Sequence, residues 1–588
     1  MFGGKILLRN LFSMLVTLLF LATMNTLVKG QEWEQSTEMK VSTSERLLPT
    51  ALSLDSLGDA ITIGQIGANS YIIKYNGLDG NILWQNILTG RTVCNLVIDS
   101  MNNFFVISYS TIAANTYSFT AKYKGTDGSL IWENSFIGDT PALTKDTQGN
   151  PVVSARSGNN YHTVKYNNAE GTVLWEANLL GANSASSPSV LADPLGNIIV
   201  AGLTGQSSTS YSYVTIKYNG IDGTVVWQKS KFSNRWFVPL QQSLACDRSG
   251  NVILISVPDI STNYLITKYS GADGSLLWEN SSLHNSNRNP KIVLTDSSND
   301  VIVADTPLYS NPSAYRYHLV KYGAADGNTI WNKSFEKEGT ATGMVLDSQN
   351  SIILTGDAGY TVKYQSTDGN IIWRKCFLNV FYSSAGSPNI VQIKGIALDS
   401  SDNVIVTGND NIAVFHGNDL YDAIMIKKYI NLAPKPPNVI SGSITDISST
   451  SSHTHATLNG VLTPNGDITD YWIEIGTDTS YSYYKTAAKP VGDGWSAIQI
   501  NDSFTVGQFN TTYHVRLVAS NIMGTIYGED QTFNSGPPAD ACLEFPTQEQ
   551  IDACHEMGSL FSDSGGAGGD ASSLQLHSAL QWLRSWNH

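Results

Sequence analysis

Two histidines, His453 and His455, lie two residues apart and have side chains of a type that binds metal ions. Residues two apart on an extended strand share one face, so the two imidazoles are expected to lie side by side. Structural zinc sites take four protein ligands and catalytic ones take three. The sequence offers no third ligand here, and the alternative is an exposed polar strand. We therefore predict no metal site.

Two short motifs near the C-terminus contain residue types that hydrolases use. "SDSGG" at 562–566 is similar to the nucleophile loop of trypsin-like proteases, but it lies in a Gly-rich tail with no protease domain around it. A motif outside its structural context does not indicate the activity. "HEMGS" at 555–559 lacks the second histidine of a zinc-protease helix, and the haem signature C-x-x-C-H is absent. Because no nucleophile, base and orienting residue can be assembled, we predict no catalytic residues.

The five cysteines divide into two groups. Cys94, Cys246 and Cys376 are scattered through repeated segments and are expected to be small core residues. Cys542 and Cys554 flank a short segment and are predicted to form a disulfide in an oxidising compartment. The alternative is that these two thiols stay unpaired.

A repeated sequence phrase predicts the structural units in which the first three cysteines lie. "IKYNGIDGTVVW" ends at Trp227, and similar phrases end at tryptophans 42 to 53 residues apart. A period near fifty with turn signals inside it indicates an array of similar units. We expect each tryptophan to fill the gap between neighbouring units. The tryptophans are Trp84, Trp132, Trp175, Trp227, Trp278, Trp331 and Trp373.

A second phrase alternates with the first. "ADPLGNIIVAG" begins at Ala192, and eight copies of this phrase occur, one more than the tryptophan phrases. Each unit then holds four short extended runs separated by Asp-rich and Gly-rich turns. The runs are apolar on both faces, which indicates sheets packed between neighbouring sheets. Four-stranded sheets packed around an axis form a β-propeller, and eight units predict eight blades.

The eighth unit lacks its fourth run, and an open ring would leave a sheet edge unpaired. "EWEQS" at 32–36 resembles "LWENS" at 277–281, and Trp33 precedes Trp84 by one period. We therefore predict that residues 31–42 pair with the segment around 424–429 and close the ring. The alternative is a tryptophan in an unattached leader.

These repeats resemble the eight-bladed quinoprotein-like (PQQ-like) propellers, whose blades carry a D-x-x-[TD]-G-x-x-x-W motif. They also resemble the bacterial β-propeller repeat family, and the match covers residues 51–430. The resemblance implies the propeller fold. If the chain were a quinoprotein dehydrogenase, the resemblance would also imply a quinone on the propeller axis, a calcium ion and often an adjacent cysteine pair. No two cysteines are adjacent here, so we predict no cofactor.

Residues 436–535 carry a different pattern. "ATLNGVLTPNGDITDYWIEIG" and "TTYHVRLVASNIMGTIYGEDQTF" resemble bacterial fibronectin type III-like modules. The alternation of Tyr513, Val515 and Leu517 with polar residues predicts a half-buried strand. The resemblance implies a spacer or adhesion unit. The following tail is Gly/Ser-rich, and "LQLHSALQWLRSW" at 574–586 is either an amphipathic docking helix or an unordered end.

The chain therefore divides into five predicted segments. Residues 11–23 form an apolar core behind Lys5 and Arg9, as in a secretion signal. The alternative is an uncleaved membrane anchor. The segments are a signal peptide at 1–30, a propeller at 31–430, a Pro-rich linker at 431–438, a fibronectin type III-like β-sandwich at 439–535 and the tail at 536–588.

Composition and charge restrict the partners. The net charge of −15 argues against nucleic acid, because phosphate binding needs a basic patch. We predict a secreted protein, extracellular or periplasmic, in contact with a membrane only if the signal segment is retained. Its function is predicted to be non-catalytic binding of a protein or a polysaccharide. The alternative is a secreted enzyme, either a quinone-dependent oxidoreductase or a carbohydrate-active enzyme.

The binding surface is expected on the rim opposite the Asp-Gly turns, because function usually lies on variable loops held by a rigid frame. The longest connections there are rich in aromatic residues and arginine, which anchor interfaces and sugars. The alternative is that these aromatics pack within their own loops. The predicted ligand-binding residues are Arg235, Trp236, Phe237, Tyr309, Tyr315, Arg316 and Tyr382.

Overall fold

The structure of the 588-residue chain is a computed structural model, and it divides into two units, Met1–Ala433 and Pro434–His588. Among the described residues, no helix has the length and hydropathy needed to cross a bilayer. The described residues are 32–41, 46–180, 187–207, 210–233, 243–256, 264–281, 288–307, 316–357, 359–377, 392–409, 414–416, 419–450 and 452–537.

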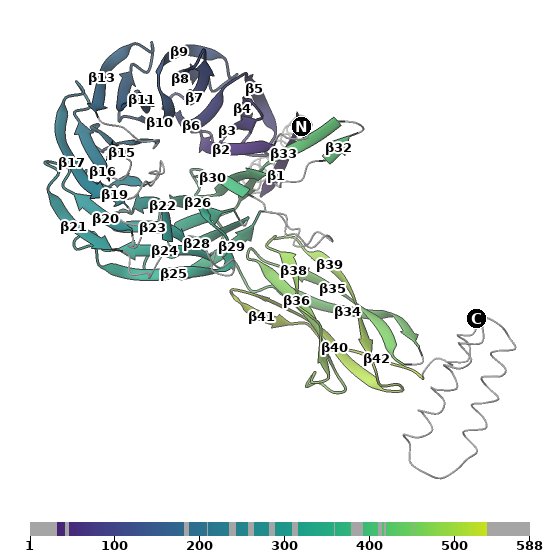
Figure 1. Ribbon diagram of the computed structural model, residues 1–588. Helices are drawn as coiled ribbons and strands as arrows, with labels where there is room; N and C mark the ends of the chain where they lie inside the picture. The colour runs from purple at the N-terminus through teal and green to yellow at the C-terminus, as the bar shows by residue number, and fades with distance from the viewer. Residues whose placement is uncertain are drawn as a thin grey trace, which may run out of the picture. The chain divides into compact units, whose positions relative to one another are not determined.

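The first unit is an eight-bladed β-propeller, as predicted: its described residues form eight antiparallel sheets, numbered here as blades 1 to 8 along the chain. Figure 1 shows the blades arranged radially around a central axis. Blade 1 contains β2 (Leu47–Leu54), β3 (Ala60–Ile66), β4 (Asn69–Tyr75) and β5 (Ile82–Leu88). Blade 2 contains β6 (Thr92–Ile98), β7 (Phe104–Ile112), β8 (Asn115–Tyr123) and β9 (Leu130–Ile137). Blade 3 contains β10 (Asp139–Lys145), β11 (Pro151–Ser157), β12 (Asn160–Tyr166) and β13 (Val173–Leu180).

The next four blades repeat this order of strands. Blade 4 contains β14 (Ser189–Ala192), β15 (Ile198–Ser207), β16 (Ser210–Tyr218) and β17 (Val225–Ser233). Blade 5 contains β18 (Leu244–Cys246), β19 (Val252–Ser256), β20 (Leu265–Tyr269) and β21 (Leu276–Ser281). Blade 6 contains β22 (Arg288–Thr295), β23 (Val301–Pro307), β24 (Arg316–Tyr322) and β25 (Thr329–Glu338). Blade 7 contains β26 (Ala341–Leu346), β27 (Ile352–Gly356), β28 (Tyr360–Tyr364) and β29 (Ile371–Cys376).

Blade 8 combines the two ends of the propeller. Its sequence-contiguous strands are β30 (Gln392–Leu398), β31 (Val404–Asn409) and β33 (Asp419–Tyr429), and the short β32 (Val414–His416) pairs with β33. The outer strand is β1 (Trp33–Val41), which pairs antiparallel with β33 so that Trp33 lies opposite Lys428. The predicted closure by the N-terminal segment is confirmed, and the pairing runs further than expected, to Leu420.

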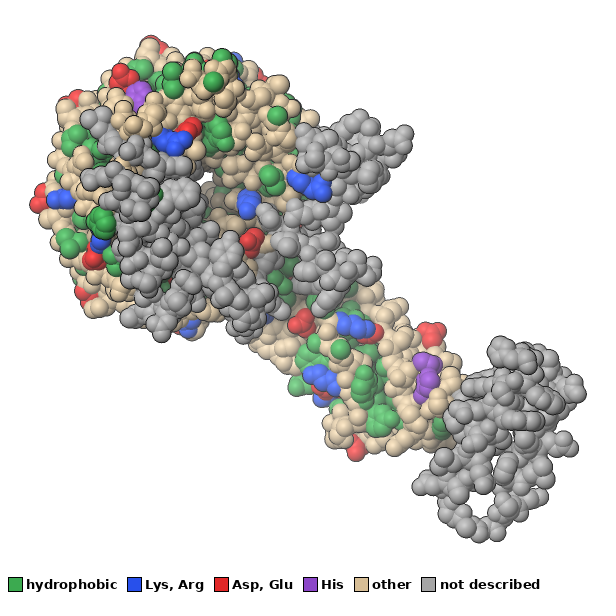
Figure 2. All heavy atoms as spheres, viewed as in Figure 1, with side chains coloured by type: hydrophobic (Ala, Val, Ile, Leu, Met, Phe, Trp, Pro, Cys, Tyr) green, Lys and Arg blue, Asp and Glu red, His purple; other side chains and the backbone are tan. Residues whose placement is uncertain are grey.

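The position of each strand in its blade follows from its burial. The first strands of consecutive blades contact one another and therefore lie nearest the axis, whereas the fourth strands form the perimeter. The second strands pack against a blade on either side, so β19 and β31 are buried along their whole length, whereas β3, β7 and β11 are buried except at their last residues. Exposed apolar side chains such as Val225 and Val226 lie on the perimeter strands, where Figure 2 shows scattered hydrophobic surface.

The second unit is a β-sandwich with both sheets antiparallel. One sheet contains β34 (Asn438–Ser449), β35 (Thr454–Thr463) and β39 (Ile498–Val506). The other contains β36 (Thr469–Gly476), β37 (Tyr484–Lys485), β38 (Lys489–Gly492), β40 (Thr512–Asn521), β41 (Gly524–Tyr527) and β42 (Gln531–Asn534). Both sheets contribute to one hydrophobic core. In β40, Tyr513, Val515 and Leu517 are buried while His514 and Arg516 are partly exposed, which confirms the predicted alternation.

Candidate functional site

Most of the predicted ligand-binding residues lie outside the described part of the chain. These are Arg235, Trp236, Phe237, Tyr309, Tyr315 and Tyr382. The backbone of Arg316 is described, and it begins β24 opposite Glu338 of β25. Cys542 and Cys554 also lie outside the described residues, so their pairing stays a prediction.

The three described cysteines lie in three different blades and form no disulfide with one another. Cys376 is buried, and Cys94 and Cys246 are partly buried. Burial raises the pKa of Cys94 and of Cys246 to about 12, with nearby Asp193 and Asp247 adding to the effect at Cys246. A protonated thiol is a weak nucleophile and a weak metal ligand, so these cysteines act as core residues.

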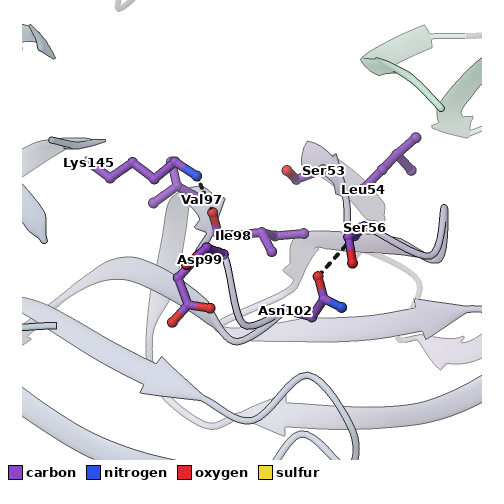
Figure 3. A pocket seen from close by; sticks show the side chains of 9 residues that line it. Ser53, Leu54, Ser56, Val97, Ile98, Asp99, Asn102 and Lys145 are labelled. Atoms are coloured by element: carbon purple, nitrogen blue, oxygen red, sulfur yellow. Dashed lines mark hydrogen bonds between the residues drawn. The ribbon is translucent and has the colours of Figure 1, made fainter. Parts of the chain in front are cut away.

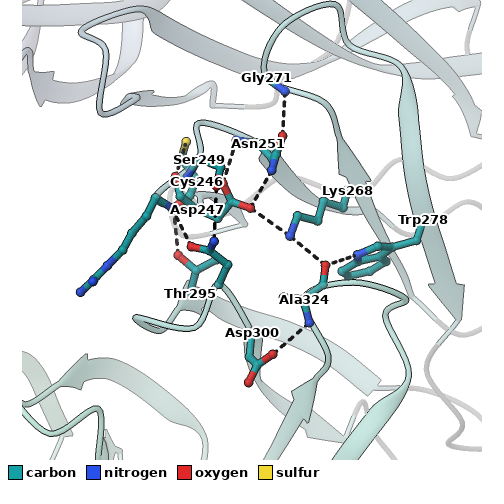
Figure 4. Close-up of polar contacts among 12 residues, drawn as sticks. Cys246, Asp247, Ser249, Asn251, Lys268, Gly271, Trp278, Thr295, Asp300 and Ala324 are labelled. Carbon is teal, nitrogen blue, oxygen red and sulfur yellow. Dashed lines mark hydrogen bonds and ion pairs between the residues drawn. The ribbon is translucent and has the colours of Figure 1, made fainter.

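The charged residues of the repeats meet inside the blades, and blade 5 shows how. Asp247 follows β18, and its Oδ1 accepts the backbone N–H groups of Ser249 and Asn251 at 2.9 Å each. Its Oδ2 lies 2.9 Å from Nζ of Lys268 on β20 (Figure 4). Burial raises the pKa of Asp247, but hydrogen bonds from Asn251 and Lys268 outweigh it, so that the pKa is lowered overall. The carboxylate is thus held ionised by its own turn and its own blade.

The same lysine links blade 5 to blade 6. Lys268 Nζ donates to the carbonyl oxygen of Ala324 at 3.0 Å, and the indole Nε1 of Trp278 donates to that oxygen at 3.0 Å (Figure 4). The backbone N–H of Ala324 is in turn held by Asp300 at 2.9 Å. The carbonyl oxygen of Ala324 in blade 6 therefore accepts hydrogen bonds from two side chains of blade 5.

An ion pair of this kind occurs in each of the eight blades of the described structure. The lysine and aspartate side chains are at most 9% exposed, and the N–O distances are 2.5 to 2.9 Å. Removing one partner of a buried pair typically costs about 3–5 kcal/mol, because the other charge is left uncompensated. The pairs are Lys74–Asp55, Lys122–Asp99, Lys165–Asp146, Lys217–Asp193, Lys268–Asp247, Lys321–Asp296, Lys363–Asp347 and Lys428–Asp399.

Seven of the eight blade tryptophans also pack on the Asp-Gly or Glu-Gly turn of the next blade. Gly223 has a φ of 72°, and a Cβ added there would lie 2.8 Å from Cδ2 of Trp175. Glycine is therefore required both by the backbone conformation and by the indole beneath it. The same contact is made by Trp33, Trp84, Trp132, Trp227, Trp278 and Trp331.

Burial of the tryptophans varies around the ring. Trp33, Trp84 and Trp132 are partly buried, whereas the other five are buried, with exposed fractions of 1 to 8%. In seven of the eight, Nε1 donates at 3.0 to 3.2 Å to a backbone carbonyl of the next blade. These positions and contacts are those of residues that hold the blades together.

The interface between blades 7 and 8 departs from this pattern. Trp373 is 1% exposed, yet its Nε1 has no hydrogen-bond partner among the described residues. The chain leaves blade 8 after Tyr429 toward the second unit instead of forming an Asp-Gly turn. Lys363 donates there to the side-chain Oδ1 of Asn431 at 2.7 Å.

Acidic residues of the N-terminal segment replace part of the missing turn. Glu32 Oε1 lies 3.1 Å from Nζ of Lys375, whose side chain is 1% exposed, and also accepts the N–H of Ile430 at 3.4 Å. Glu34 lies 3.5 Å from Lys427. The closing strand thus brings counter-charges to two buried lysines of the last blades.

An open hollow of about 300 Å³ lies where the inner strands of blades 1 to 3 approach the turn rim (Figure 3). Lys145 extends into it and donates to the carbonyl of Ile98, and Asn102 Oδ1 accepts the N–H of Ser56 at 2.9 Å. Asp99, the carboxylate of this hollow, is paired with Lys122. The hollow therefore offers hydroxyl, amide and amino groups but no unpaired carboxylate.

A tyrosine, an aspartate and a histidine meet between blades 5 and 6. Tyr264 donates to Asp305 Oδ2 at 2.8 Å, and His318 Nδ1 lies 3.1 Å from Asp305 Oδ1. Burial, followed by the charge of Asp305, raises the pKa of Tyr264 well above its usual value. All three residues are at most 2% exposed, so no substrate reaches them and they belong to the core.

His453 and His455 lie on one outward face at the start of β35, as their spacing predicts. Their Nε2 atoms are 2.9 Å apart. Within the described residues, no group of three His, Cys, Asp or Glu side chains is arranged to hold a metal ion.

The sequence interpretation missed the repeated lysine. It assigned the aspartates to local turns, and they do hold their turns, but each also pairs with the lysine of the Lys-Tyr phrase. The signal was present: a lysine recurring in a strand that is apolar on both faces must be buried, and a buried lysine needs a counter-charge.

Comparison with known proteins relates the chain to other propellers. BamB from Moraxella catarrhalis is 12% identical, with 67% of this chain and 98% of that chain covered at a TM-score of 0.41. A quinohemoprotein alcohol dehydrogenase from Pseudomonas putida HK5 is 10% identical, with coverages of 71% and 79% and a TM-score of 0.43. No curated protein matches the chain. Residues 68–235 match the model of a PQQ-like family described as outer membrane protein assembly factor BamB.

Proposed function

We propose that this protein is a non-catalytic propeller scaffold that binds a protein or a polysaccharide through the loops of one rim. The observation that carries the proposal is the use of the repeated charged residues. The eight carboxylates that follow the first strands are paired with lysines of their own blades. The aspartates of the Asp-Gly turns accept backbone N–H groups of their own turns. The charged residues that recur in every blade thus stabilise the fold. We infer that the specificity of ligand binding comes from residues that do not recur.

The family match over residues 68–235 supports a scaffold, since that family is described as an assembly factor. The second unit then serves as a spacer or an adhesion module of the fibronectin type III-like kind. The protein would act outside the cytoplasm, with the N-terminal segment as its signal peptide.

Two observations favour binding over the quinone chemistry of quinoprotein dehydrogenases. The three described cysteines lie in separate blades, so they form no adjacent pair. The carboxylate of the open hollow at blades 1 to 3, Asp99, is held by Lys122 at 2.9 Å. An ion at this hollow would have to compete with a buried lysine for its ligand.

The test is a screen of the purified chain against glycan arrays and extracellular protein fractions, followed by variants of both rims. Trp236→Ala and Tyr382→Ala remove aromatics from the long connections. Ile221→Ser and Leu195→Ser change side chains that are 88% and 79% exposed on the turn rim, and they serve as controls.

The proposal predicts that the first pair weakens binding to the identified ligand with an unchanged melting temperature, while the control pair leaves binding intact. If only the control pair loses binding, the ligand binds to the turn rim, and the proposal is contradicted. Substrate-dependent dye reduction after loading with pyrroloquinoline quinone and Ca²⁺ would favour the oxidoreductase instead.

A further inference from the structure

The two histidines of the second unit are positioned by the start of β35. Thr454 between them is fully buried, which turns His453 and His455 to the outer face of the sheet. Their Nε2 atoms are 2.9 Å apart, their ring centres 4.5 Å apart, and their ring planes are at 80° to each other. Figure 2 shows histidine side chains exposed together on the surface of this unit.

The two rings are within hydrogen-bond distance of each other, and the same separation is close to that of two ligands bound at a right angle to one metal ion. Metal–imidazole bonds are about 2.05 Å long, so two bonds at 90° place the nitrogens about 2.9 Å and the ring centres about 4.5 Å apart. A tetrahedral angle would instead place the nitrogens about 3.3 Å apart. Right-angled nitrogen ligands are typical of tetragonal Cu²⁺ and Ni²⁺ sites rather than of Zn²⁺ sites.

A third residue orients one of the rings. Ser452 Oγ lies 2.8 Å from Nδ1 of His453. When Nδ1–H donates to an oxygen, Nε2 carries the lone pair and is free to bind a metal, as in most metal-ligating histidines. The serine hydroxyl can accept from Nδ1–H of His453, and in that tautomer the ring is ready to coordinate through Nε2.

The surroundings leave room for a cation and its remaining ligands. His455 is exposed and borders a hollow of about 370 Å³ that Tyr484 and Lys489 also line. The charge of Lys489 is balanced by Asp502, whose Oδ1 lies 2.5 Å from the lysine Nζ. Solvent can therefore complete the coordination of a bound ion, and the nearby lysine adds little repulsion.

We propose that His453 and His455 form a two-coordinate chelate for a divalent transition metal, with Cu²⁺ bound most tightly. Copper stands highest in the affinity order of first-row divalent ions for nitrogen ligands. The site is solvent-accessible and exchangeable, and it is independent of the ligand that the propeller binds.

The experiment uses the full chain purified without a polyhistidine tag. Cu²⁺ is titrated by calorimetry, and the bound ion is observed by electron paramagnetic resonance. The spectrum is expected to show a tetragonal site with hyperfine coupling to two imidazole nitrogens. Ni²⁺ and Zn²⁺ are titrated in parallel and are expected to bind more weakly.

The variants are His453→Gln and His455→Gln, with His514→Gln as the matched control. His514 is a partly exposed histidine of the same unit, held by Asp530 at 2.7 Å, and lies outside the proposed site. Either site variant should weaken Cu²⁺ binding about tenfold or more, since loss of even an outer-shell partner typically costs 10–100-fold. Each should also remove one nitrogen from the spectrum, and His514→Gln should change neither.

Two results would overturn the proposal. One is unchanged Cu²⁺ affinity in the chain that carries both site substitutions. The other is a wild-type spectrum with a single imidazole nitrogen, which would mean that the two rings only hydrogen-bond to each other. Melting temperatures equal to that of the wild type confirm that each variant is folded.

Discussion

Lys268 and Trp278 lie opposite each other on neighbouring strands of blade 5 and donate to the same carbonyl oxygen of blade 6. The lysine is anchored by Asp247 in its own blade, and the tryptophan lies on Gly327 of the next blade. Blade 5 is thus tied to blade 6 by one charged and one aromatic group, and the interface between blades 7 and 8 is the one among the described blades that lacks the indole hydrogen bond. The lysine and the tryptophan of the recurring sequence phrase are the two residues that make this contact.

The indole N–H groups should contribute measurably to stability. Trp278→Phe removes a hydrogen bond to Ala324, whereas Trp373→Phe removes an N–H that has no partner among the described residues. Both changes also lose ring area, so their difference isolates the hydrogen bond. We expect Trp278→Phe to lower the free energy of unfolding by about 1 kcal/mol more than Trp373→Phe. Urea unfolding of the two variants measures this difference, and equal losses would contradict it.

The glycines of the Asp-Gly turns are required by contact as well as by conformation. Gly223 and Gly90 have similar φ values of 72° and 67°, but only Gly223 has an indole within reach of an added Cβ. Both alanine variants carry the cost of a positive φ. Gly223→Ala should lower the free energy of unfolding by about 1–3 kcal/mol more than Gly90→Ala, because the side chain overpacks against Trp175. Equal melting temperatures for the two variants would contradict this prediction, because they would show that the Trp175 indole moves aside without loss of stability.

The N-terminal strand should be needed for a stable monomer. Removing residues 31–42 deletes the pairing with β33, together with Glu32, the counter-charge of the buried Lys375. The exposed edge favours pairing with other chains. We expect a lower melting temperature and self-association by sedimentation. Gln35→Ala is the control that should behave as wild type, because among the described residues the Gln35 side chain bonds to the carbonyl of its neighbour Ser36.

Stability should fall at both extremes of pH. The pKa of Asp146, Asp193, Asp247 and Asp399 is lowered in the folded state, so their contribution is present above the unfolded value of about 3.9 and is lost as pH falls below it. Burial raises the pKa of Tyr75 and Tyr322 to about 12. Their contribution is present below an unfolded value of about 10 and is lost as pH rises toward 12.

Urea unfolding across this range checks the prediction. A plateau of stability is expected between about pH 5 and 9. Asp247→Asn should flatten part of the acid limb, because it removes one of the titrating carboxylates. A steep loss of stability centred near pH 7 would contradict the assignment and would point to histidines.

The fold was predictable because its signals repeat. The eight copies of the phrase that includes Asp193 specify the number of blades, and the position of Trp33 one period before Trp84 specifies the closure. The role of Lys268 and its equivalents was predictable in principle but was missed, since the charged residues were interpreted one turn at a time.

The candidate sites were less predictable, for physical reasons. The long connections that carry Trp236 and Tyr382 do not repeat, so periodicity says nothing of them. The spacing of His453 and His455 predicts a shared face. Convergence of their Nε2 atoms to 2.9 Å depends on side-chain torsions that the neighbouring residues set.

The most direct test of the claim that the repeated charges serve the fold is a double-mutant cycle on Asp247 and Lys268. Asp247→Asn, Lys268→Met and the double variant are compared with wild type by urea unfolding. We predict that each single change is strongly destabilising and that the double variant loses less than the sum, by about 1–3 kcal/mol, because no unpaired charge stays buried. Ligand binding by the folded variants should be unchanged. Additive losses, or a stable single variant that has lost ligand binding, would contradict the claim.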